Sequence, residues 1–191
     1  MFNVPNAITL ARFALVPALA LELLRREYGT AMALFTVCAL SDVADGMIAR
    51  RWNLRTRFGA VADPLADKLT MLTVTLLLAV QHALPWWFAL AVVLRDGVIV
   101  SGALAYHLWI GPVPMAPSRI SKLNTALEFL LLFAALAIRA GQVPDGRWWH
   151  VLLLATLVTV ALSGGHYVLV WSRKAARARR TSSRRSDPCR P

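Results

Sequence analysis

Long apolar runs separated by short polar breaks dominate the chain. Six of these runs approach the length of about 20 residues that a helix needs to cross a bilayer. Gly and Pro clusters punctuate them, instead of bounding the short alternating segments typical of strands. The pattern predicts an all-α, polytopic membrane protein with six transmembrane helices. The predicted spans are Ile8–Leu24, Thr30–Arg50, Ala60–Val80, Pro85–Leu108, Ser121–Ile138 and Trp149–Trp171.

Composition agrees with this pattern and separates the end of the chain from the rest. Hydrophobic residues make up 58% of the sequence and the mean hydropathy is +0.55, more apolar surface than one soluble core of this size could bury. Residues 173–191 instead carry eight Lys or Arg against one acid, Asp187. We therefore expect a transmembrane domain over residues 1–172 and a basic, disordered cytoplasmic tail over residues 173–191.

The charged residues also predict a topology. The net charge is +11, but beside a membrane span a basic tail more often contacts anionic lipid than nucleic acid, so we expect no nucleic-acid partner. Basic residues gather in the tail and in the loops after the second and fourth spans, so these segments and both termini are expected in the cytoplasm. The first span has no basic residues before it and is expected to be retained. The opposite loops carry only Arg25, Arg26, Arg139 and Arg147.

Four of the ten acidic residues fall within the second and third spans, at Asp42, Asp45, Asp63 and Asp67. A carboxylate at membrane depth costs several kcal/mol unless a cation compensates it. The first two share one helix face, and the last two lie at i and i+4 on the next helix. Because a short loop makes the two helices pack side by side, the four carboxylates can converge on one spot.

Oxygen ligands without His or Cys suit hard divalent cations such as Mg²⁺, Mn²⁺ or Ca²⁺, and four carboxylates can hold two of them about 4 Å apart. Gly46, Ala49 and Gly59 share the same faces, so a large ligand such as a nucleotide could approach the backbone there. The alternative is a set of buried ion pairs with Arg50, Lys68 and Arg95, in which the small residues serve helix packing.

These residues resemble the signature of the CDP-alcohol phosphotransferase family, with every fixed position at the family's spacing. The matching positions are, in order, Asp42, Asp45, Gly46, Ala49, Arg50, Gly59, Asp63 and Asp67. The resemblance implies a six-helix membrane fold, usually a homodimer, with two divalent cations, Mg²⁺ or Mn²⁺, bound by the four aspartates. It also implies that Asp67 acts as general base. The CDP group would lie over Asp42, Asp45, Gly46, Ala49, Arg50 and Gly59.

The resemblance further implies transfer of a phosphatidyl group from CDP-diacylglycerol to a hydroxyl acceptor, with release of CMP, in a bacterial inner membrane. Arg95-Asp96 and the stretch Ser118–Thr125 look more like the CMP-forming cardiolipin synthases, which favours phosphatidylglycerol as the acceptor. Glycerol 3-phosphate, used by phosphatidylglycerophosphate synthases, is the alternative. Arg95, Arg119 and Lys122 are the cations expected to hold the acceptor's phosphate. A cation transporter and a non-catalytic scaffold are the more distant alternatives.

Overall fold

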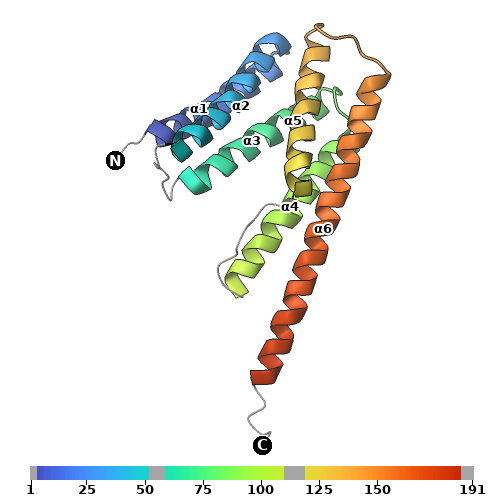
Figure 1. Cartoon of the computed structure of the whole chain (residues 1–191). Helices are drawn as coiled ribbons and strands as arrows, with labels where there is room; N and C mark the ends of the chain where they lie inside the picture. Colours follow the sequence, from blue (N-terminus) through green and yellow to red (C-terminus); the bar gives the residue numbers. More distant parts are fainter. Residues whose placement is uncertain (1–3, 52–58, 110–118, 186–191) are drawn as a thin grey trace, which may run out of the picture. The chain divides into compact units, whose positions relative to one another are not determined.

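The computed structural model describes residues 4–51, 59–109 and 119–185, with side chains described for residues 11, 13–41, 65–102 and 120–167. These residues form six helices and no strand (Figure 1), so the all-α, six-helix prediction is confirmed for the described part of the chain. The helices are α1 Val4–Leu24, α2 Tyr28–Arg51, α3 Gly59–Val80, α4 Trp86–Trp109, α5 Arg119–Arg139 and α6 Arg147–Arg185.

The predicted limits of the first five helices agree with these bounds to within a few residues, whereas α6 runs well past its predicted end at Trp171. It continues as a helix through Arg185. The added stretch is rich in Ala, Arg and Lys and contains neither Gly nor Pro, so its residues favour helix without any packing partner. The division into a membrane domain and a basic tail stays a prediction.

Three helices end with the same backbone motif. α1, α3 and α5 are each followed by a residue in the left-handed region, namely Arg26 (φ 63°), His82 (φ 56°) and Gly141 (φ 71°). The next backbone N–H then donates to the carbonyl five residues back, which is the Schellman pattern for satisfying the free carbonyls of a helix end. These bonds are Glu27 to Glu22 at 2.9 Å, Ala83 to Leu78 at 2.8 Å and Gln142 to Ala137 at 3.0 Å.

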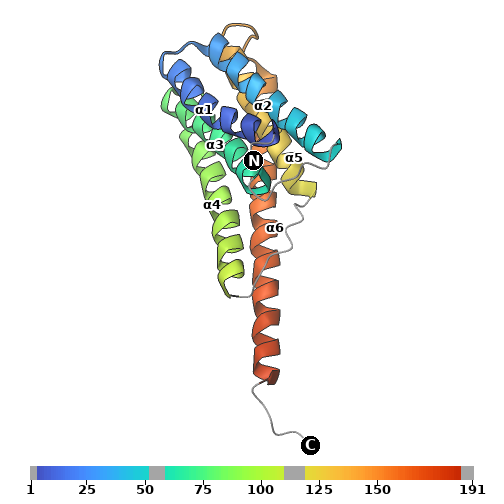
Figure 2. The same ribbon diagram turned by 90° about the vertical axis from the view of Figure 1, so that its left-hand side faces the viewer.

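The chain divides into two compact units. The first comprises residues 1–89 and 128–152, and the second comprises residues 90–127 and 153–191. In the first unit α1, α2 and α3 pack against one another (Figure 2). Their contact buries large apolar side chains that recur at helical spacing, which gives this unit its core. The fully buried members include Leu19, Leu23, Phe35, Val74 and Leu78.

The outward faces of the helices are also apolar. Leu40 is 64% exposed and Val151 is 65% exposed, and many other Leu, Val and Trp side chains are exposed along the helices. Within the described residues, the segments Ile120–Arg139 and Arg147–Tyr167 are long and apolar enough to cross a membrane. An apolar core combined with an apolar exterior is what a bilayer, and not water, stabilises. The fold is that of a membrane protein.

The second unit buries several polar groups beside the apolar side chains of Val92, Leu153 and Val160. Arg95 on α4, Asn124 on α5, and Thr156 and Ser163 on α6 are all buried. Membrane helices commonly associate through such side chains, because a polar group in hydrocarbon must find a protein partner. This unit is therefore joined by hydrogen bonds between its helices.

Candidate active site

The aspartate motif occupies the facing ends of two consecutive helices. Asp42 and Asp45 belong to the last turns of α2, and Asp63 and Asp67 to the first turns of α3, which begins at Gly59. The predicted helical spacing within each pair is therefore confirmed by the backbone. Of the predicted metal and nucleotide residues, only Asp67 has a described side chain. The side chains of Asp42, Asp45, Gly46, Ala49, Arg50, Gly59 and Asp63 lie outside the described set.

Asp67 is half-buried and lines a small cavity between helices of the first unit. The cavity has a volume of about 10 Å³, close to the space of one water molecule. Facing Asp67 across this space is α2, and α5 closes one side. The other lining residues are Phe35, Cys38 and Ala39 on α2, Thr70 on α3 and Phe129 on α5.

The cavity identifies the inner face of α2. Phe35 and Cys38 are both buried, and the ring of Phe35 stacks on that of Phe129 with centroids 4.7 Å apart. Asp42 follows Cys38 by four residues, and Asp45 follows Asp42 by three. Both aspartates therefore lie on the helix face that carries Phe35 and Cys38. The aspartates of α2 thus follow directly on the face that packs into the first unit.

The inner face of α3 is defined in the same way. Thr70, Val74 and Leu78 are buried and succeed Asp67 at helical spacing. Asp63 lies one turn earlier on this face. The hydroxyl of Thr70 donates to the carbonyl of Ala66 at 2.9 Å, so it is satisfied within its own helix. Asp67 therefore marks the point where the apolar interior of α3 gives way to the acidic turn.

Arg95, predicted to hold the acceptor, is embedded among protein partners in the second unit. Its residue is only 8% exposed. Nη1 donates to Asp96 Oδ1 at 2.8 Å, and Nη2 donates to Ser121 Oγ at 3.0 Å and to Ser163 Oγ at 2.8 Å. Nε is buried and has no hydrogen-bond partner among the described residues. The ion-pair alternative expected Arg95 to pair with an aspartate of the motif. The salt bridge that the structure describes for Arg95 is with Asp96.

The other two predicted acceptor residues begin α5. The Lys122 side chain is exposed, and that of Arg119 lies outside the described set. Ser121, between them in sequence, is the residue that Arg95 holds. A second polar contact lies one turn further along, where the Thr159 hydroxyl on α6 donates to Asn124 Oδ1 at 3.1 Å. The structure thus joins Arg95 to the stretch that carries Arg119 and Lys122.

Sequence reasoning missed several residues of these two regions. Ser163 gave no signal of its own, because serine is common in membrane helices. Ser121 lay within the 118–125 stretch, but nothing in the sequence indicated that Arg95 would be its partner. The Ser163-Gly164-Gly165 run was the one available hint, since a Cβ added to Gly164 would come within 3.6 Å of Arg95 Cγ. Cys38 could have been found by extending the periodicity of Asp42 and Asp45 toward the start of α2.

Comparison with known proteins extends the resemblance over nearly the whole chain. The sequence model of a family described as CDP-alcohol phosphatidyltransferase matches residues 2–171. A CDP-diacylglycerol–glycerol-3-phosphate 3-phosphatidyltransferase of Pectobacterium atrosepticum is 34% identical, with 83% of this chain and 89% of the relative covered. A CMP-forming cardiolipin synthase of Streptomyces coelicolor is 29% identical, with 90% and 79% covered.

A CMP-forming cardiolipin synthase of Rattus norvegicus is 27% identical over 182 residues, which cover 87% of this chain. The chain spans 60% of the length of that relative. The similarity therefore includes proteins named as cardiolipin synthases and one named as a glycerol-3-phosphate phosphatidyltransferase, and it runs through both the aspartate motif and the helices that follow. By the extent of the family match, the chain belongs to the CDP-alcohol phosphatidyltransferase family.

Proposed function

We propose that this protein transfers a phosphatidyl group from CDP-diacylglycerol to a hydroxyl acceptor. The acceptor oxygen forms a new bond to the phosphorus that carries diacylglycerol, the phosphoanhydride bond breaks, and CMP leaves with the bonding electron pair. Asp67 takes the proton of the attacking hydroxyl. No covalent intermediate on the protein is needed.

The observation that carries this proposal is the cavity shared by Asp67 and Cys38. α2 and α3 run antiparallel (Figure 1) and pack against each other, and the cavity sets Cys38 on α2 opposite Asp67 and Thr70 on α3. In an antiparallel pair, moving one turn forward on α2 corresponds to moving one turn back on α3. This register supports Asp42 and Asp45 lying level with the turn of α3 that joins Asp63 to Asp67.

The four aspartates fit two divalent cations, Mg²⁺ or Mn²⁺. All four offer carboxylate oxygens, which are the ligands that such hard cations prefer, and the half-buried position of Asp67 beside apolar groups favours a compensating positive charge. When bound, the cations would neutralise the donor's pyrophosphate and stabilise the departing CMP. We propose that the CDP group lies over Gly46, Ala49 and Gly59, where the absence of large side chains leaves room, with Arg50 beside it.

For the acceptor's phosphate we propose Arg119 and Lys122 as direct contacts. Lys122 is exposed, whereas both terminal nitrogens of Arg95 are already engaged with Asp96, Ser121 and Ser163. Arg95 then serves as a positioning residue, which fixes the start of α5 through Ser121. Within the proposed site it would reach a ligand through Nε, through the second N–H of Nη1, or after releasing a serine.

Phosphatidylglycerol is the acceptor we favour, which makes the product cardiolipin. The Arg95-Asp96 pair and the 118–125 stretch support this choice, as do the relatives named as cardiolipin synthases. Glycerol 3-phosphate is the second candidate, because the Pectobacterium relative named for that acceptor is 34% identical. We further propose a homodimer in a bacterial inner membrane, as the family resemblance implies. The distribution of basic loops supports an orientation with both termini and the aspartate end in the cytoplasm.

An acceptor competition tests this proposal. The purified full chain in detergent receives CDP-diacylglycerol and Mg²⁺ or Mn²⁺, with phosphatidylglycerol, glycerol 3-phosphate, or both. We expect CMP release that stops when the metal is chelated, and cardiolipin as the product identified by mass spectrometry. Formation of phosphatidylglycerophosphate alone would reverse the choice of acceptor. Absence of CMP release with either acceptor, in protein that remains folded, would remove the transferase proposal itself.

A further inference from the structure

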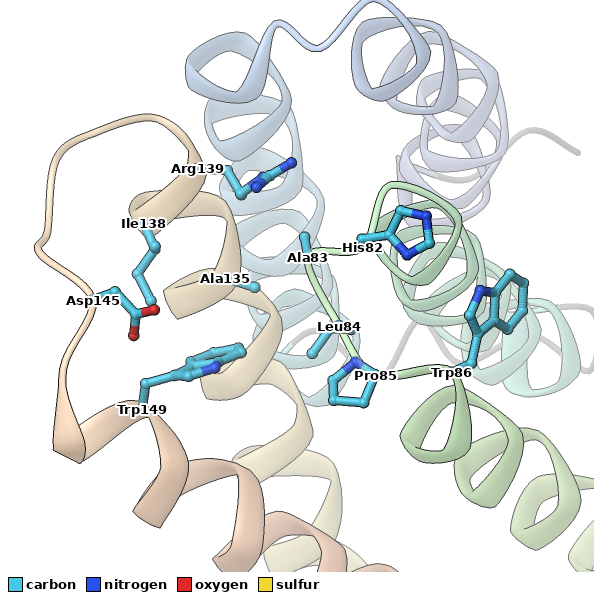
Figure 3. A pocket seen from close by; sticks show the side chains of 10 residues that line it. All are labelled: His82, Ala83, Leu84, Pro85, Trp86, Ala135, Ile138, Arg139, Asp145 and Trp149. Atoms are coloured by element: carbon cyan, nitrogen blue, oxygen red, sulfur yellow. The ribbon is translucent and has the colours of Figure 1, made fainter.

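The first unit contains a second cavity, at the end of α3 remote from the aspartates. Its volume is about 370 Å³, within the usual range for small-molecule sites. It is bounded by the turn after α3, the first residue of α4, the last turn of α5 and the loop into α6 (Figure 3). From Asp67 to Val80 the helix rises roughly 20 Å at 1.5 Å per residue, so this cavity is separate from the proposed active site.

The surroundings of the cavity are typical of a membrane interface. Trp86 lines it, and Trp87 and Trp148 are exposed nearby in sequence. Indole rings favour the head-group region, where one edge meets hydrocarbon and the other meets water. The cavity thus opens at the level of lipid head groups, in the leaflet opposite the one that the aspartate end of α3 faces.

One side of the rim is cationic and firmly held. The Arg139 guanidinium lies 5.4 Å from the centroid of the Tyr28 ring, and its Nη2 donates to the Gln81 carbonyl at 3.3 Å. Gln81 is itself fixed, since it accepts from the Tyr28 hydroxyl at 2.9 Å and donates to the Leu23 carbonyl at 2.5 Å. His82 follows in the left-handed turn and also lines the cavity. Among the described residues Arg139 uses one of its five N–H groups in this hydrogen bond, so others can face an anionic ligand.

The other side offers an anionic and aromatic surface. Asp145 is exposed and makes no hydrogen bond or ion pair with the residues that the structure describes. Its carboxylate points into the cavity on the side where the Trp149 indole lies (Figure 3). Trp149 is only 9% exposed, so its ring is restrained by the side chains packed around it. A carboxylate beside an indole face is a suitable site for an ammonium group.

We propose that this cavity binds the head group of a zwitterionic phospholipid that carries a primary ammonium. The ammonium lies between Asp145 and Trp149, and the phosphate lies toward Arg139 and His82. A quaternary ammonium has no N–H to donate, whereas a primary ammonium can donate hydrogen bonds to the carboxylate that lies beside the Trp149 ring. Opposite charges on the two sides of the cavity also disfavour a head group with a phosphate alone.

Lipid binding to the purified full chain, counted by native mass spectrometry, tests this proposal. Phosphatidylethanolamine, phosphatidylcholine and phosphatidylglycerol with identical acyl chains are compared, and soluble phosphoethanolamine is added as a competitor. We expect phosphatidylethanolamine to bind about tenfold more tightly than either other lipid, equivalent to one charge-assisted contact. Phosphoethanolamine at equal concentration should not displace it, because the acyl chains also contribute binding energy.

Two variants locate the binding. Asp145→Asn should remove the preference for phosphatidylethanolamine without changing the binding of phosphatidylglycerol, and Arg139→Gln should weaken phosphatidylethanolamine and phosphatidylcholine alike. Glu27→Gln, an exposed carboxylate outside the cavity, is the matched control, and circular dichroism checks the fold of each variant. Equal binding of all three lipids, an unchanged preference in Asp145→Asn, or full displacement by phosphoethanolamine would each overturn the proposal.

Discussion

Asp67 and Arg95 are both charged side chains inside apolar helices, but the protein surrounds them differently. Arg95 is closed in by Asp96, Ser121 and Ser163, which occupy both of its terminal nitrogens. Asp67 is half-buried and opens onto a cavity between α2 and α3. Arg95 therefore links helices, whereas Asp67 borders the space next to which we propose the metal site.

The energetics of membranes explain why both arrangements persist. A charged group away from water costs several kcal/mol unless it is compensated. Hydrogen bonds to residues on three helices offset this cost for Arg95. Removal of Arg95 should therefore mainly affect folding. Asp67 belongs to a set of aspartates whose compensation we assign to divalent cations, so its removal should mainly affect chemistry. The two residues should therefore separate activity from stability.

The largest effect is expected for the chemistry of Asp67. Asp67→Asn keeps the size of the side chain but removes both the proton acceptor and one metal-ligand charge. We expect CMP release from CDP-diacylglycerol to fall by about 10²- to 10⁴-fold, the usual contribution of a general base. Turnover is measured under saturating donor and acceptor, and thermal unfolding in detergent is measured on the same sample.

Glu27→Gln is the matched control, because Glu27 is exposed in the turn between α1 and α2 and also loses one carboxylate charge. It should retain the activity of the unmodified chain. If Asp67→Asn turns over as fast as Glu27→Gln, Asp67 is neither the base nor a metal ligand, and the contrast with Arg95 disappears.

The next largest effect is on stability at Arg95. Arg95→Met preserves an unbranched side chain but removes the cation that pairs with the part-buried Asp96 and the donor to the hydroxyls of Ser121 and Ser163. Removing one partner of a buried ion pair lowers the free energy of unfolding by about 3 to 5 kcal/mol. We expect a loss of this size in the free energy of unfolding, measured by denaturant titration in mixed micelles.

A surface arginine provides the comparison. Arg25 pairs with Glu22 at 3.3 Å, but its side chain is 69% exposed, and such pairs contribute at most about 1 kcal/mol. Arg25→Met should therefore leave stability nearly unchanged. Equal losses in the two variants would mean that Arg95 is not the buried link that its hydrogen bonds indicate.

The sequence was most informative where one helix suffices to make the prediction. The six helices and the spacing of Asp42 with Asp45, and of Asp63 with Asp67, depend only on runs of apolar residues and on 3.6 residues per turn. α6 continues past the predicted span end at Trp171, because its basic continuation favours helix even though the charge of that stretch suggests a separate tail. Arg26 and His82 could not be foreseen as left-handed residues, since both lack the freedom of glycine that such turns favour.

The contacts between helices could not be predicted from the sequence. Arg95 was recognised as functional from its position in a motif, but its bonds to Ser121 and Ser163 depend on the register of α4, α5 and α6. Periodicity does not determine that register. The same holds for the cavity that sets Cys38 opposite Asp67. Such pairings arise from packing, and they are the reason why we propose a positioning role for Arg95, whose predicted contact with the acceptor stays a prediction.

The smallest effect, and the sharpest test of that description, is expected at Ser163. Ser163→Ala removes one of two hydroxyls that accept from Arg95 Nη2 and leaves the bonds to Ser121 and Asp96 in place, so stability should fall by about 1 kcal/mol. Gly165→Ala, two residues along α6, is the control, because a Cβ there meets no atom within 4 Å and should be neutral or stabilising. If Arg95 positions the start of α5, Ser163→Ala should also raise KM for the acceptor while leaving KM for CDP-diacylglycerol unchanged. A loss of stability with both KM values unaltered would restrict Arg95 to holding the helices together.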